Sequence, residues 1–122
     1  MKVFNLTKHQ MTSDQVANGG LNVPAAQAAT ELHDFVVMPT AADMQLRAAA
    51  LMSLAQADGA VAGDGVMLAG PMYFIPPLVD AARDAGFVPT FSFTQRVAVE
   101  KPQEDGSVKL EYIFRHEGWM TV

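Results

Sequence analysis

The sequence predicts a single α/β domain with a mostly parallel sheet and a C-terminal antiparallel strand. The strongest indication is the stretch from Asp64 to Gly86, where the apolar run 66–69 is stopped by Gly70 and Pro71 and followed by a helical pattern. Continuous apolar runs of this length are typical of strands buried on both faces of a sheet. The predicted order of elements, β-α-β-α-β-α-β-β, indicates a three-layer arrangement in which helices cover the sheet.

Composition limits the function classes. The 122 residues form one domain, residues 1–122, which is long enough to bury a core. The chain has no cysteine, which excludes disulfides and thiolate chemistry. The net charge of −5 argues against binding of long nucleic acid but allows a small anionic ligand held by a few local cations. The N-terminus does not resemble a signal peptide and no apolar run approaches membrane-spanning length, so we expect a cytoplasmic protein that does not bind membranes.

Apolar runs and alternation define the expected strands. The later strands alternate aromatic or aliphatic side chains with polar ones, as expected where one face meets solvent. Asp105-Gly106 marks the hairpin connection between the last two. The predicted strands are residues 3–6, 35–38, 66–69, 88–99 and 108–114.

Caps and prolines define the expected helices. Thr12 and Gln15 form a capping box, and Thr40 with Asp43 repeats the N-cap signature. Prolines are tolerated in a first helical turn, where no intrahelical amide partner is needed. The predicted helices run from Thr12 to Gly19, over residues 24–32, from Thr40 to about Asp58, and from Pro76 to Gly86.

The candidate site lies at the carboxyl ends of the strands, where parallel α/β sheets bind ligands. Lys8 and His9 follow the first strand, and the segment 70–74 follows the central one. His9 is the better histidine for proton transfer or phosphate contact. His33, between a helix and a strand, is interpreted as a surface or capping residue. The alternative is that the strand-end charges are solvated and never converge.

The hairpin adds further candidates. If Lys101 pairs with Val108, Phe93 lies opposite His116 and Arg96 lies opposite Ile113. This register brings Arg96, Arg115 and His116 towards the edge that carries Lys8 and His9. Arg115 and His116 point to opposite faces as neighbours on a strand, so only one of them is expected to reach a given pocket.

The motifs of several common enzyme classes are absent from the sequence. There is no HExxH, Walker-type, GxGxxG or GxSxG motif. The aspartates are scattered over caps and loops without the spacing of a metal centre. We therefore expect neither a metal nor a cofactor.

Short motifs resemble those of a known family. They are Val3-Phe4-Asn5-Leu6-Thr7-Lys8-His9, Met11-Thr12-x-x-Gln15, the Gly63-Asp64 loop before a strand that ends in Gly70, and the terminal Phe114-Arg115-His116. They resemble small CRISPR-associated proteins of the Csx type, including phage and prophage relatives. The resemblance implies a Rossmann-like fold related to CARF domains, a homodimer, and a ring nuclease that linearises cyclic oligoadenylate.

The leading hypothesis is thus a metal-independent ring nuclease in CRISPR or phage defence signalling. Two alternatives are a sponge that binds a nucleotide messenger without turnover, and a structural or assembly protein. Gln15 could be a cap partner only, and Tyr73 could stack on a base or merely pack. The expected catalytic residues are His9, Arg96 and Arg115, and the expected ligand-binding residues are Thr7, Lys8, Gln10, Gln15, Gly70, Met72, Tyr73 and His116.

Overall fold

The computed structural model describes residues 1–122 and contains one five-stranded sheet with the order β2-β1-β3-β4-β5. The first four strands in this order are parallel, and β5 pairs antiparallel with β4. The predicted α/β class, with a mostly parallel sheet and a C-terminal antiparallel pair, is confirmed. The strands are β1 (Val3–Asn5), β2 (Gly20–Asn22), β3 (Gly65–Met67), β4 (Val88–Pro102) and β5 (Val108–Thr121).

The helices begin where the capping residues predict. Thr12 and Gln15 form both hydrogen bonds of a capping box at α1, and Thr40 accepts from the amide of Asp43 at α3. Pro76 and Pro77 occupy the first turn of α4. The helices are α1 (Ser13–Ala17), α2 (Pro24–Ala28), α3 (Ala41–Ala57) and α4 (Ile75–Asp84), with short 3-10 helices η1 (Thr30–Leu32) and η2 (Met72–Phe74).

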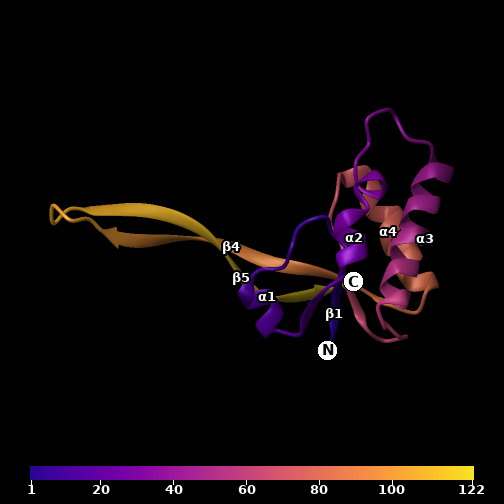
Figure 1. Ribbon diagram of the computed structural model, residues 1–122, viewed down its shortest axis with the longest axis horizontal. Helices are drawn as coiled ribbons and strands as arrows, with labels where there is room; N and C mark the ends of the chain where they lie inside the picture. The colour runs from indigo at the N-terminus through magenta and orange to yellow at the C-terminus, as the bar shows by residue number, and fades with distance from the viewer.

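The main core lies on one face of the sheet. Side chains of β1 and β3, including Phe4 and Val66, pack against buried residues of α3 and α4 such as Leu51 and Leu78. Figure 1 shows α2, α3 and α4 on one side of β1 and α1 on the other. The α1 side has a smaller cluster formed by Val3, Met11 and Met67, against which Trp119 packs.

The prediction of a buried strand over residues 35–38 is wrong. These residues form a loop between η1 and α3, and the side chains of Val36 and Met38 are each 93% exposed. The second strand is instead β2, where the sequence predicted only the end of a helix. A side chain at Gly20 would overlap Met11, so β2 can lie this close to the neighbouring residues only with glycine at this position.

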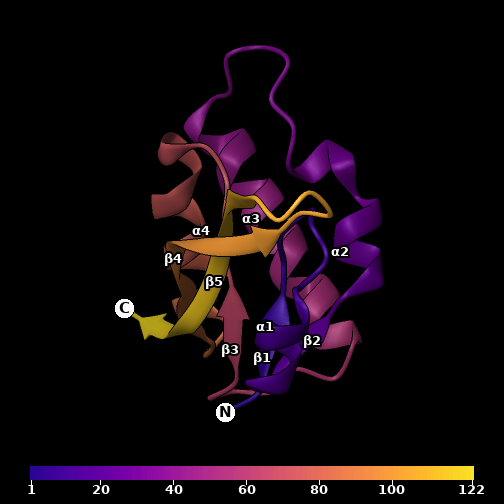
Figure 2. The same ribbon diagram turned by 90° about the vertical axis from the view of Figure 1, so that its left-hand side faces the viewer.

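The predicted hairpin register is also wrong by one residue. Pro102 pairs with Val108 and Lys101 with Lys109, so Arg96 lies opposite Phe114 instead of Ile113. A bulge between Phe93 and Thr94 shifts the pairing again towards the body. Beyond this bulge the hairpin projects far from the rest of the molecule, as Figure 1 shows, and in Figure 2 it points towards the viewer. We call this projection, residues 94–116, the arm.

Candidate functional site

A cavity of about 340 Å³ lies where β1 and β3 end. Its walls come from the turn after β1, the segment before α3 and the turn after β3, which places it at the carboxyl edge that the sequence predicted. The lining residues are Thr7, Lys8, His9, His33, Asp34, Phe35, Ala69, Gly70, Pro71 and Tyr73.

The turn after β1 is held by the side chain of Asn5, which is fully buried. Its amide nitrogen donates to the carbonyl of His9 at 2.6 Å and to Oδ1 of Asn22 at 2.9 Å. Its Oδ1 accepts from the backbone amide of Thr7 at 2.9 Å and from the Thr7 hydroxyl at 2.7 Å. A buried amide that satisfies all these groups fixes the backbone from Thr7 to His9.

Two further polar side chains extend this network. Gln27 of α2 donates from Nε2 to the carbonyls of Asn5 and Thr7, at 3.0 and 2.7 Å. Oδ1 of Asn22 also accepts from the amide of Met11 at 3.0 Å. Asn5, Asn22 and Gln27 were not among the site residues predicted from the sequence. An asparagine inside an apolar strand was the available signal, because buried polar side chains require partners.

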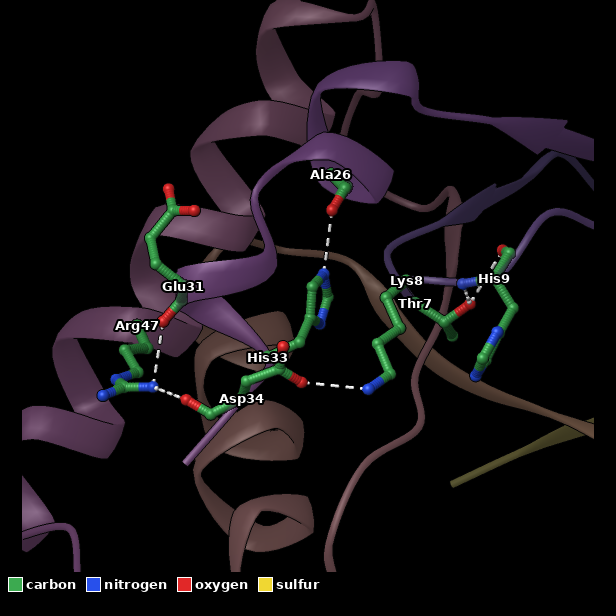
Figure 3. A network of polar contacts seen from close by, with 8 residues as sticks. All are labelled: Thr7, Lys8, His9, Ala26, Glu31, His33, Asp34 and Arg47. Atoms are coloured by element: carbon green, nitrogen blue, oxygen red, sulfur yellow. Dashed lines mark hydrogen bonds and ion pairs between the residues drawn. The ribbon is translucent and has the colours of Figure 1, made fainter. Parts of the chain in front are cut away.

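Lys8 reaches across the cavity to the loop before α3. Its ammonium donates to Oδ1 of Asp34 at 2.9 Å, as Figure 3 shows. This hydrogen bond and the positive charge of Lys8 lower the pKa of Asp34, with a smaller effect from His33. Both partners are about half exposed, so the pair is open to salt and to competing anions.

His33 is buried, which contradicts the surface interpretation, but it is the C-cap residue of η1, where its backbone amide donates to the carbonyl of Thr30 at 3.0 Å. Its Nε2 lies 2.8 Å from the carbonyl oxygen of Ala26, and in Figure 3 the ring points towards α2. Because a carbonyl can only accept, Nε2 carries the proton in this contact. His33 therefore joins the loop to α2 and forms one wall of the cavity.

Arg47 of α3 fixes the same loop from the other side. Its Nη1 donates to the carbonyls of Glu31 and Asp34, at 2.9 and 2.7 Å. Its guanidinium carbon lies 4.5 Å from the ring centre of Phe35. The sequence analysis missed Arg47, although its position four residues after Asp43 indicated the ion pair that the two form.

The turn after β3 forms the aromatic wall. Gly70 has φ of +154°, a conformation that favours glycine. Phe74 is buried, whereas Tyr73 is half exposed and lies edge-on to Phe35, with the two ring centres 5.4 Å apart. Met72 is 89% exposed and is not among the lining residues.

The structure thus groups five of the predicted site residues: Thr7, Lys8, His9, Gly70 and Tyr73. His9 is exposed and, in Figure 3, its ring lies to one side of the Lys8–Asp34 pair, with no contact marked between them. Gln10 is exposed in the same turn but does not line the cavity. Gln15 accepts from the amide of Thr12 at 2.9 Å, as its cap role requires.

The predicted site residues of the hairpin lie away from the cavity. The guanidinium of Arg96 stacks over Tyr112 at 4.1 Å on the arm. Arg115 is paired with Gln95 in the ladder of the arm. His116 contacts Ser92 Oγ at 2.6 Å and Asn18 Nδ2 at 3.1 Å. Within one chain these three residues do not line the cavity.

Two features are absent from the structure. No group of three or more histidine, aspartate or glutamate side chains lies close enough together to bind a metal ion. No helix is both long and apolar enough to cross a membrane.

The fold and the cavity define a small α/β protein with a polar pocket at the carboxyl edge of its sheet. Residues 1–120 match the Uncharacterized protein MJ1673 family, so the chain belongs to this family. No curated protein and no solved structure matches the chain.

Proposed function

We propose that the carboxyl-edge cavity binds a cyclic oligoadenylate and linearises it without a metal, in cytoplasmic CRISPR or phage defence signalling. The observation that carries the proposal is the fixed turn from Thr7 to His9, which presents a hydroxyl, an ammonium and an imidazole at one cavity. The proposal includes a Rossmann-like, three-layer relationship in which α1 and its small cluster represent the layer opposite α3 and α4.

The proposed step is an internal transfer at one phosphodiester. The ribose 2′-oxygen bonds to phosphorus, the bond from phosphorus to the 5′-oxygen breaks, and the products are a 2′,3′-cyclic phosphate and a 5′-hydroxyl. The 2′-hydroxyl loses a proton and the 5′-oxygen gains one, and the imidazole of His9 can move this proton. The Lys8 ammonium can stabilise negative charge on the phosphoryl oxygens as the bonds change.

The size of the cavity favours a dimer. Its volume of about 340 Å³ is near the lower end for small-molecule sites. One cavity therefore accommodates a single nucleotide unit more readily than a whole ring. A two-fold dimer supplies two equivalent half-sites to a symmetric ring. Arg96 and Arg115 keep their proposed catalytic role only if a second chain brings them to the cavity.

A non-catalytic sponge is the second candidate, and the Lys8–Asp34 pair favours it. The ammonium is already hydrogen bonded to a carboxylate, so an incoming phosphate competes with Asp34 for it. Because the Lys8 ammonium can exchange the carboxylate for a phosphate, it can bind the ligand. The same pairing leaves less uncompensated positive charge to stabilise a transition state.

The test is incubation of the protein with cyclic tri-, tetra- and hexa-adenylate in EDTA, followed by chromatography and mass spectrometry. Linear products ending in 2′,3′-cyclic phosphate support the nuclease, and His9→Ala should then reduce turnover by about 10²–10⁴-fold while retaining binding. Lys8→Ala should weaken binding, whereas Lys2→Ala, which removes a cation outside the cavity, should not. Intact rings that co-elute with the protein support the sponge. Intact rings without binding contradict both and leave the structural or assembly role.

A further inference from the structure

The arm has two faces of different character. On β5, Val108, Leu110, Tyr112 and Phe114 alternate along one face, and each is at least 56% exposed. Their partners on β4 share this face because directly paired residues of an antiparallel ladder point the same way. Those partners are Pro102, Glu100, Ala98 and Arg96, in the same order.

The other face of the arm is charged towards its tip. Lys101 and Lys109 are direct partners in the ladder, and Lys101 pairs with Glu111 at 3.5 Å. Such side chains are typical of a solvated face, and lysine on an edge discourages unwanted pairing. The face with the aromatic row carries no lysine. Val99 and Ile113 of the other face are 37% and 42% exposed, so the more exposed apolar surface lies on the face with the aromatic row.

The arm also lacks support from the body. Strand β3 pairs with β4 only from Val88 to Thr90, so the arm is a two-stranded ribbon with both edges unpaired. Isolated two-stranded hairpins are at best marginally stable in water, and a stable ribbon needs a further strand or a packed face. His116 at the base of the arm contacts Asn18 beside α1, but Figure 1 shows no other part of the chain beside the outer part of the arm.

We propose that the apolar face of the arm packs against the same face of a second copy of this chain. The two arms lie in opposite directions, related by a two-fold axis that passes at the level of Ala98 and Tyr112. Tyr112 then meets its counterpart, and Phe114 meets Leu110 of the partner subunit. The two faces pack as aligned sheets do in a sandwich. This inference does not depend on nucleotide binding.

Charge complementarity identifies a second copy as the occupant. Arg96 and Glu100 lie two residues on either side of Ala98, on the same face of β4. Reversal of the strand about Ala98 therefore sets Arg96 against the partner's Glu100, and Glu100 against the partner's Arg96. An isologous interface requires such self-complementarity. A small side chain at the axis allows the two β4 strands to approach.

The footprint predicts a weak association. The apolar face covers about 20 Å by about 10 Å, since the strands rise about 3.4 Å per residue from Val108 to Phe114 and lie about 4.8 Å apart. About 200 Å² per partner is well below the roughly 800 Å² of a standard interface. We therefore expect association that changes with protein concentration across and above the micromolar range, which sedimentation velocity can follow.

The decisive experiment measures sedimentation of the full chain without nucleotide, across and above the micromolar range, for charge-exchange variants. Arg96→Glu and Glu100→Arg should each weaken the dimer by at least about tenfold, since each sets like charges against one another at both ends. The double variant Arg96→Glu/Glu100→Arg should restore the wild-type constant. Lys109→Glu is the matched control, because it makes the same charge change on the other face and should have no effect.

Replacement of an apolar residue by a charged one gives a second test. Leu110→Lys should also weaken the dimer, while circular dichroism and the thermal midpoint of the body stay close to wild type. A wild-type chain that remains monomeric overturns the proposal, and so does a dimer that tolerates Arg96→Glu and Leu110→Lys. Failure of the double variant to restore association contradicts the two-fold arrangement at Ala98. Nucleotide binding is measured separately on the wild type, so either proposal can fail alone.

Discussion

Asn5 is the residue on which the geometry of the cavity depends. Its side chain joins β1, β2 and the turn that carries Lys8 and His9, through four hydrogen bonds. Asn5→Ala removes these four bonds and leaves the buried amide of Thr7 without a partner, whereas Asn22 Oδ1 and the carbonyl of His9 each keep another donor. The unpartnered amide costs about 1–3 kcal/mol, and each of the other lost hydrogen bonds about 0.5–1.5 kcal/mol. We expect the free energy of unfolding to fall by about 3 kcal/mol in urea denaturation.

Asn18 provides a matched control for this prediction. Its amide also bonds across the fold, to His116, but it is exposed and water can replace the contact. Asn18→Ala should cost less than about 1 kcal/mol. Equal losses for the two variants would contradict the anchoring role of Asn5.

The Lys8–Asp34 pair makes a prediction about pH. The pKa of Asp34 is lowered in the folded protein, so the pair stabilises the fold above the ordinary aspartate pKa of about 3.9. This contribution is lost as the pH falls through the lowered value. In Lys8→Met the pKa of Asp34 should rise towards its ordinary value, as read by NMR titration of the carboxyl carbon.

Salt serves as the internal check on that titration. Because the pair is about half exposed, high salt should reduce the difference between wild type and Lys8→Met. An Asp34 carboxyl that titrates identically in both proteins at low salt would show that the ion pair does not form.

At the scale of elements, local patterns predicted the helices better than the strands. Capping residues and prolines specify a helix start within a few residues, and those at α1, α3 and α4 were read correctly. Residues 35–38 have the composition of a strand, yet Phe35 packs on the aromatic wall and the next three side chains are exposed. Strand formation depends on partners distant in sequence, which composition does not show.

A triple substitution tests this correction. Val36, Val37 and Met38 are 93%, 74% and 93% exposed, so replacing all three by serine should change the free energy of unfolding by less than about 0.5 kcal/mol. Val66→Ser in β3 is the comparison, and it should cost at least about 2 kcal/mol because Val66 is fully buried. Equal losses in urea denaturation would restore the buried-strand interpretation.

At the scale of the whole molecule, the sequence predicted the sheet and the edge that carries the cavity. Thr7, Lys8 and His9 were placed correctly because residues that follow a parallel strand lie at its carboxyl edge. Arg96, Arg115 and His116 were not placed correctly, because the register of the hairpin depends on the turn from Gln103 to Ser107 and on the bulge at Phe93. A shift of one residue moves a side chain to the other face. The partners of Asn5 and Arg47 around the cavity lie on segments that are distant in sequence, so local signals at these residues did not show what they hold together.

The most direct test of the proposed function is an NMR titration of the ¹⁵N-labelled protein with cyclic tetra-adenylate in EDTA. We predict saturable shifts in the amides of residues 7–10, 33–35, 69–70 and 72–73 that disappear in Lys8→Ala. The groove between α3 and α4, which includes Gln45 and Asp84, is the internal control and should not respond. Shifts confined to that groove, or no shifts at all, would contradict a ligand site at the carboxyl edge of the sheet.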